Sequence, residues 1–451
     1  MNDGKPSYVR WFLVFWIFVL SAVAFLDRVN ISIAGIAIRE AYGFSKLQLG
    51  YVFSSFLAGY TLFQTVGGRL ADRLGSRRVL AVGVLWWGVF TALTAAVPAA
   101  IGHALFWFIA VRFLLGAGEA VVYPASNQFV ANWIPVHERG IANGIIFAGV
   151  GVGAGLAPPL ITYVMMKYGW HGSFWVCAVV GVVAGLVWYI AARDNPQEHP
   201  QVNSAELGKI RAHLGQSETP PAGKKSLLPW SVVLRSKDVW AVTVSYFCYG
   251  YVAWVFFSWF YSYLAEVRGL DLKASAFYAM LPFLAMAAAC PLGGIVNDRI
   301  TKLHGRRLGR CGIAVVSIAI AAVFIAIGSQ VSSARLASVV LAGGAGALYL
   351  SQSSFWSVTA DIGGKSSGSV SGFMNMGAQL GGATTASLTP LIGDHFGWTA
   401  SFLVAAALCV VGAGAWFFVN PDMTLAPGEN ADCSDTAPSG VITASLGTAK
   451  D

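Results

Sequence analysis

Charged residues are scarce in this chain. Only 11% of its 451 residues are Asp, Glu, Lys or Arg, whereas soluble globular proteins carry about 25%. Hydrophobic residues make up 56% of the sequence, and the mean hydropathy is +0.64. So little polar surface excludes a soluble domain of this length and a disordered chain. Because the apolar residues form long runs and do not alternate as in a membrane β-barrel, they predict membrane-spanning helices.

The sequence also lacks the motifs of several enzyme classes. Its six cysteines form no C-x-x-C pair, which argues against a zinc site or a disulfide framework. There is no G-x-x-x-x-G-K-[ST] nucleotide-binding loop, and no histidine lies in the middle of an apolar run. We therefore expect no enzymatic activity, no bound metal and no cofactor. The net charge of +8 is typical of cytoplasmic loops of a membrane protein and predicts no nucleic-acid partner.

Twelve apolar runs are long enough to cross a bilayer as helices. They lie near 11–38, 47–68, 79–97, 103–126, 141–166, 173–193, 238–265, 275–296, 311–330, 334–360, 368–392 and 398–419. We predict an all-α integral membrane protein with a six-helix bundle over 1–193, a linker over 194–237, a second bundle over 238–420 and a disordered tail over 421–451. Within the linker, Ala205–Leu214 is expected to form a short amphipathic helix.

The basic residues orient these helices. Most of the 29 Lys and Arg residues fall in the loops on the side that holds both termini and the linker. Cytoplasmic loops are enriched in Lys and Arg. The sequence therefore predicts a multi-pass protein of a bacterial inner membrane with both termini in the cytoplasm.

The two halves of the chain resemble each other. Gly67–Arg73 (G-G-R-L-A-D-R) recurs as Gly293–Arg299 (G-G-I-V-N-D-R), and Tyr168–Phe174 recurs as Phe396–Phe402. Because each half has an even number of predicted helices, the halves share one orientation. The sequence thus predicts two parallel six-helix repeats, a transporter architecture that places the substrate between the repeats near the middle of the membrane.

The loop G-G-R-L-A-D-R-L-G-S-R-R (Gly67–Arg78) resembles the signature loop of the major facilitator superfamily. Asp72 can cap the N-terminus of the next helix and pair with a neighbouring arginine. In that superfamily the loop is a conformational latch and not a substrate site. The resemblance implies the same role for the residues of this loop and of its copy, namely Gly68, Asp72, Arg73, Asp298 and Arg299.

Four charged residues lie well inside the apolar runs: Asp27, Arg28, Arg112 and Glu119. Each costs about 2.5–3.5 kcal/mol at the centre of a membrane helix. They could form a structural cluster in which the charges only neutralise one another. We favour a functional interpretation, because an arginine can bind a carboxylate through two hydrogen bonds and a buried carboxylate can take up a proton.

Several segments resemble the anion:cation symporter family within that superfamily. They are F-L-D-R-V-N-I-S-I-A (Phe25–Ala34), R-F-L-L-G-A-G-E-A-V-V-Y-P-A (Arg112–Ala125), Asp361 and G-F-M-N-M-G-A-Q-L-G-G (Gly372–Gly382). The family includes bacterial permeases for hexuronates, galactonate and glucarate, and animal sialin. The resemblance covers roughly residues 10–420. It implies that Asp27 and Glu119 are protonation sites and that Arg28 contacts the substrate anion.

Further polar and aromatic residues could contact a substrate. Besides Arg28, the candidates are Arg112, Tyr60, Gln64, Tyr249, Trp254, Ser353, Trp356, Ser357, Asn375 and Gln379. Each polar one could equally form a hydrogen bond between helices. Tyr60, Trp356 and Gln379 match binding positions of galactonate-type permeases. Phe25 and Val150 stand where those permeases often carry Tyr and Gln, which favours a smaller, less hydroxylated or more aromatic carboxylate.

These observations predict a monomeric, proton-coupled symporter that imports an organic anion, such as a sugar acid, by alternating access. Its partners would be the anion, protons and the lipid bilayer. Two alternatives remain open. A proton-driven exporter of drugs or metabolites would favour a cationic or amphiphilic substrate, which the two buried arginines disfavour. A nutrient sensor that binds without transporting would usually carry a long signalling extension.

Overall fold

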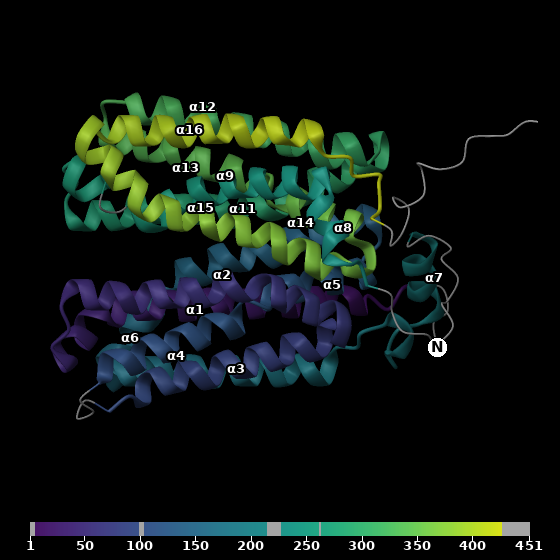
Figure 1. Cartoon of the computed structure of the whole chain (residues 1–451), viewed down its shortest axis with the longest axis horizontal. Coiled ribbons are helices and arrows are strands. Elements are labelled where there is room, and N and C mark those ends of the chain that lie inside the picture. Colours follow the sequence, from purple (N-terminus) through teal and green to yellow (C-terminus); the bar gives the residue numbers. More distant parts are fainter. Residues whose placement is uncertain (1–4, 99–102, 214–226, 261–262, 426–451) are drawn as a thin grey trace, which may run out of the picture.

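The computed structural model of this chain describes residues 5–98, 103–213, 227–260 and 263–425, and the regular secondary structure in these ranges is helical. Figure 1 shows two bundles of long helices side by side, which we call the N-terminal and the C-terminal lobe. Residues 214–226 of the predicted linker and 426–451 of the predicted tail, with Cys433, lie outside the described residues.

The membrane-length helices follow the predicted apolar runs. The N-terminal lobe contains α1 (Val9–Tyr42), α2 (Lys46–Leu74), α3 (Ser76–Ala96), α4 (Ala104–Glu119), α5 (Val122–Trp133) and α6 (Arg139–Ala191). The C-terminal lobe contains α9 (Lys237–Ser258), α11 (Leu272–His304), α12 (Ile313–Gln330), α13 (Ala334–Leu350), α14 (Gln352–Gly363), α15 (Ser367–Phe396) and α16 (Trp398–Ala415). Between the lobes lie the short helices α7 (Ser204–His213) and α8 (Trp230–Arg235).

Nine stretches of the described chain are long and apolar enough to cross a membrane. Two of them contain two passes each. α6 turns at Gly169, whose φ of 70° suits a residue without a side chain, and the stretch Ala334–Phe396 comprises α13, α14 and α15. Together with α2, which has 29 residues, the described chain therefore contains the twelve predicted passes.

The first and last described residues lie at the same end of the molecule as α7, and we call this end the linker end (Figure 1). The expected helix near Ala205–Leu214 is present there as α7. Its Glu206 accepts hydrogen bonds from the backbone N–H groups of Val9 (3.1 Å) and Arg10 (3.2 Å) and from the Arg10 guanidinium (3.0 Å). The carboxylate thus binds α7 to the start of α1.

The fourth pass of each lobe is broken in its middle. In the N-terminal lobe, α4 and α5 are separated at Ala120–Val121, where Pro124 lacks the N–H that would bond to the Ala120 carbonyl. In the C-terminal lobe, α13 and α14 are separated at Ser351, whose hydroxyl donates to the Leu348 carbonyl at 2.6 Å. Interrupted membrane helices are common beside transported ligands.

Two aspartates join the lobes at the linker end. Asp72 of α2 accepts hydrogen bonds from the backbone N–H groups of Gly368 (2.9 Å) and Ser369 (2.7 Å) at the start of α15. Asp298 of α11 accepts them from Gly140 (2.8 Å) and Ile141 (2.6 Å) at the start of α6. Each lobe therefore caps a helix of the other lobe, and a negative charge at a helix N-terminus is stabilising.

The prediction that Asp72 caps the next helix is wrong. The start of α3 is capped by Asp194, which accepts from the Arg77 N–H at 2.8 Å. Asp72 instead faces α15, because two glycines bring α2 and α15 into backbone contact. A Cβ atom on Gly68 would lie 2.0 Å from the carbonyl oxygen of Gly368.

The remaining predicted latch residues differ in position. Gly68, Asp72 and Asp298 lie at the contact between the lobes. Arg73 and Arg299 are exposed and form no hydrogen bond or ion pair with described residues. The arginine that pairs with Asp298 is instead Arg310 (2.9 Å), which also pairs with Asp361 (3.3 Å) and donates to the Val136 carbonyl of the other lobe.

The lobes are closed at the linker end. Within the described ranges, the hydrogen bonds that join the two lobes lie between that end and the middle of the molecule. Besides the two aspartate caps they include Gln128–Ser367, Arg139–Asp361, Asn127–Thr359, Asn143–Ser357 and Gln64–Asn375.

Candidate binding cavity between the lobes

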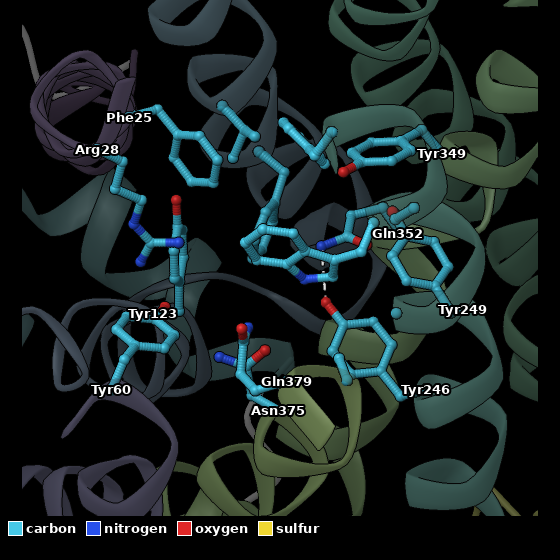
Figure 2. Close-up of a pocket in the computed structure, with 17 residues that line it drawn as sticks. Phe25, Arg28, Tyr60, Tyr123, Tyr246, Tyr249, Tyr349, Gln352, Asn375 and Gln379 are labelled. Atoms are coloured by element: carbon cyan, nitrogen blue, oxygen red, sulfur yellow. Dashed lines mark hydrogen bonds between the residues drawn. The ribbon is translucent and has the colours of Figure 1, made fainter. Parts of the chain in front are cut away.

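A cavity of about 80 Å³ lies where the two lobes meet in the middle of the molecule. Figure 2 shows its side chains converging from both lobes. The N-terminal lobe contributes Phe25, Arg28, Tyr60, Tyr123, Phe147 and Val150, and the C-terminal lobe contributes Tyr246, Tyr249, Gly250, Ala253, Trp254, Phe257, Tyr349, Gln352, Asn375, Ala378 and Gln379. Aromatic rings surrounding a few polar groups are typical of a small-molecule site.

Arg28 supplies the positive charge of this lining (Figure 2). Its guanidinium carbon lies 4.2 Å from the ring centre of Tyr60 and 4.6 Å from that of Phe25. Contacts of this kind between a guanidinium and ring faces hold the arginine in place and leave its N–H groups free for other partners.

Arg28 is paired with Glu119, which is fully buried where α4 ends. The Nε atom of Arg28 donates to one carboxylate oxygen of Glu119. The Nη2 atom of Arg28 and the second oxygen of Glu119 have no partner among the described residues. The pair therefore joins α1 to α4 and keeps hydrogen-bonding capacity for a ligand or a proton.

The other two buried charges lie behind the cavity. Asp27 accepts a hydrogen bond from the Thr91 hydroxyl of α3 at 2.7 Å. The guanidinium carbon of Arg112 lies 5.0 Å from the ring centre of Phe56. The Nε and Nη1 atoms of Arg112 have no hydrogen-bond partner among the described residues. The four charges thus all belong to the N-terminal lobe, with only Arg28 in the cavity wall.

The C-terminal lobe contributes neutral hydrogen-bonding groups. The Tyr246 hydroxyl accepts from Gln352 Nε2 and from Trp356 Nε1, both at 3.0 Å. The Tyr249 hydroxyl and the Oε1 atoms of Gln352 and Gln379 are buried without partners in the described part of the chain. These groups could bind the hydroxyl or amide groups of a ligand whose anionic end contacts Arg28.

The structure divides the sequence-predicted residues into two groups. Six line the cavity: Arg28, Tyr60, Tyr249, Trp254, Asn375 and Gln379. The others are absent from this lining: Asp27, Arg112, Glu119, Gln64, Ser353, Trp356 and Ser357. Several of the second group form the interhelical hydrogen bonds that were the alternative interpretation, as Gln64 does with Asn375 (2.9 Å) and Ser357 with Asn143 (3.4 Å).

Sequence reasoning missed residues in both lobes. Tyr123 lies beside the break between α4 and α5 and bonds to the Ser21 hydroxyl at 2.9 Å. In the sequence, only the position of Tyr123 directly before Pro124 could have indicated that this residue lies at a helix break. Gln352 lines the cavity and follows the break in the tenth pass. Thr91, which donates to Asp27, could not be found from the sequence, because one threonine in an apolar helix resembles many others.

Comparison with known proteins agrees with this architecture. Residues 17–386 match the family model of the Major Facilitator Superfamily. The chain is 35% identical to the probable sulfoacetate transporter of Cupriavidus necator, covering 91% of this chain and 94% of that protein. It is 29% identical to the hexuronate transporter of Bacillus subtilis, covering 93% of this chain and 97% of that one.

The fold is similar to that of a solved proton:xylose symporter of the superfamily. The TM-score is 0.72 at 16% sequence identity, and the match covers 93% of this chain and 98% of that one. At this identity the likeness concerns the fold alone. With the family match over most of its length, the chain belongs to the Major Facilitator Superfamily and is a multi-pass membrane transporter.

Proposed function

We propose that this protein is a proton-coupled symporter that imports a small organic anion. The observation that carries the proposal is the buried Arg28–Glu119 pair, whose unpartnered Arg28 Nη2 belongs to the cavity wall. The names of the relatives support the substrate class, because they include transporters of sulfoacetate, hexuronate and galactarate or D-glucarate. All of these substrates are organic acids.

The four buried charges suggest how an anion and protons could be coupled. In the empty site the charges of Asp27, Arg28, Arg112 and Glu119 sum to zero. A substrate anion would add one uncompensated negative charge in a region where charge is costly. A proton on Glu119 would remove that charge and release Arg28 from its partner, so that the guanidinium could bind the substrate through two hydrogen bonds.

The linker end faces the cytoplasm in this proposal, because most basic loop residues lie there. The described conformation, which is closed at the linker end, would then face the outside of an inner membrane. Substrate and proton would enter from that side. Separation of Asp72 from α15 and of Asp298 from α6 would then open the site to the cytoplasm.

The chain forms a cavity without a second copy, so we propose that the monomer is the transporting unit. A drug exporter is less well supported, because the charge in the described cavity lining is positive and would repel cations. A sensor would bind the anion but would not move it across a membrane. Uptake measurements therefore separate the proposal from both alternatives.

The proposal is tested in two steps with purified protein. A thermal-shift screen against monocarboxylic and dicarboxylic sugar acids, sulfonates and aromatic acids identifies a ligand. Proteoliposomes are then assayed for uptake of that ligand with and without an inward proton gradient. We expect accumulation only with the gradient, and loss of accumulation in Glu119→Gln with exchange of internal for external ligand retained.

Glu40→Gln is the matched control, since Glu40 is an exposed carboxylate on α1 away from the cavity. It should accumulate the ligand as the wild type does. Gradient-driven accumulation by Glu119→Gln at the wild-type rate would disprove the proton role of Glu119. Stabilisation by organic cations and by no anion would contradict the substrate class.

A further inference from the structure

A second cavity, of about 270 Å³, lies on the outer surface of the N-terminal lobe. It is a groove between α2 and α3 whose floor is the junction of α4 and α5. Its walls carry exposed apolar side chains, among them Val66 (47% exposed), Leu74 (53%) and Val82 (62%). Since this face of the lobe would contact the membrane interior, the groove is open to lipid and separate from the central cavity.

The groove exists because small residues meet at its floor. Val121 packs between Gly67 of α2 and Gly83 of α3, where added Cβ atoms would lie 2.7 Å and 2.3 Å from its methyl groups. No side chain from these two positions can therefore cover the floor. Trp86 forms part of one wall, and its Nε1 atom donates to the Leu114 carbonyl at 2.8 Å, which fixes the ring.

Arg78 supplies the one charged side chain among the residues that line this groove. It lies in the first turn of α3, at the linker end, and its side chain is exposed. This side chain forms no hydrogen bond or ion pair with any described residue. An apolar groove that ends at an unpaired cation is complementary to a molecule with an alkyl chain and an anionic head.

We propose that this groove binds an anionic phospholipid of the leaflet at the linker end. One acyl chain lies along the walls of α2 and α3, and the phosphate binds Arg78. Charge complementarity selects the headgroup, because basic residues near a membrane surface attract anionic lipids. The groove is distinct from the transport cavity, so the lipid is not a substrate.

The lipid chain in this site contacts the break in the fourth pass. Gly118 and Val121, which line the groove, flank Glu119 and Ala120. The backbone of Gly118 and the side chain of Val121 therefore contact the lipid on one face of this short segment, while Glu119 pairs with Arg28 on the other side. The lipid would thereby support the backbone that positions Glu119.

Native mass spectrometry of the full chain tests the site. Delipidated protein in detergent is mixed with equal amounts of phosphatidylglycerol, phosphatidylethanolamine and phosphatidylcholine that carry the same acyl chains. We expect phosphatidylglycerol to be retained about fivefold more than either zwitterionic lipid, which corresponds to about 1 kcal/mol for one basic residue. Arg78→Gln should abolish that preference, and Val82→Trp, which fills the groove, should reduce retention of all three lipids.

Two matched variants control for general effects. Arg307→Gln removes an exposed arginine at the linker end of the other lobe, and Val183→Trp enlarges an exposed valine of α6. Neither residue lines the groove, so both variants should retain lipid as the wild type does. Melting temperatures in the same detergent show that the four variants are folded. Equal retention of the three lipids by wild type, or an unchanged preference in folded Arg78→Gln, would overturn the proposal.

Discussion

Asp72 and Asp298 each cap a helix of the opposite lobe across the contact between the lobes. Each accepts hydrogen bonds from two backbone N–H groups at the start of a helix in the other lobe. The two residues occupy equivalent positions in the sequence repeats. The closed linker end is therefore held by a symmetric pair of carboxylates at helix N-termini, with Arg310 bound only to the Asp298 member.

Removing one of these carboxylates should shift the protein toward opening at the linker end. Hydrogen bonds to charged groups contribute about 1.5–3 kcal/mol each, so Asp72→Ala should raise the open population substantially. Spin labels at Leu74 and Leu303, exposed positions of the two lobes, would report the shift as a longer distance by pulsed electron resonance. An unchanged distance distribution would show that Asp72 does not hold the closed state.

Gly68→Ala should open the linker end by a steric route. The added methyl carbon would lie 2.0 Å from the Gly368 carbonyl oxygen, so α2 and α15 could no longer touch. Gly50→Ala is the control in the same helix, since a Cβ at Gly50 meets no atom within 4 Å. The same spin-label pair should lengthen in the first variant alone. If both variants behave like the wild type, the backbone contact is not required for closure.

Arg28→Lys should weaken substrate binding although the charge is kept. A lysine cannot donate the paired hydrogen bonds of a guanidinium or stack flat on Tyr60. Loss of one charge-assisted hydrogen bond corresponds to about a tenfold or larger increase in the dissociation constant. Calorimetric titration with the ligand from the thermal-shift screen measures the change, and Arg335→Lys, on an exposed site of α13, is the control. Equal affinities of Arg28→Lys and Arg335→Lys for the ligand would show that Arg28 does not bind it.

Thr91→Val should alter the pH dependence of uptake. The Thr91 hydroxyl donates to Asp27 at 2.7 Å, and this bond favours the charged carboxylate. Without it, the buried Asp27 carboxylate loses the one hydrogen bond that it accepts from a described side chain, so the pH profile of uptake should differ from that of the wild type. Thr91→Ser keeps the hydroxyl and should restore the wild-type profile. A profile that is the same for valine, serine and threonine would show that Thr91 only fills space.

The sequence predicted the parts of this fold that depend on composition and on short motifs. The apolar runs indicated the twelve passes, and the repeated G-G-x-x-x-D-R segments indicated the two equivalent halves. Arg28 and Glu119 stood out, because a charge inside an apolar run is rare and needs a partner.

Other features depend on which helices pack against each other, and a single amino-acid sequence does not reveal that packing. Asp72 was expected to cap the helix that follows it, but the close approach of Gly68 to Gly368 turns it toward α15. Tyr246 and Gln352 line the cavity because α9 and the break before α14 lie side by side, although the two residues are far apart in sequence. Their chemistry does not distinguish them from other residues of the same runs.

The charged groups in and behind the central cavity belong to the N-terminal lobe, and the described residues with which the C-terminal lobe lines this cavity are neutral. Asp27, Arg28, Arg112 and Glu119 belong to the N-terminal lobe, whereas the C-terminal lobe offers rings, hydroxyls and amides. Substitutions in α9, α13, α14 or α15 can therefore reshape the pocket without altering the four charged residues to which we assign proton coupling in our proposal. Under that proposal, changes in the C-terminal lobe would alter which anion is bound, whereas the source of energy for its transport would stay the same.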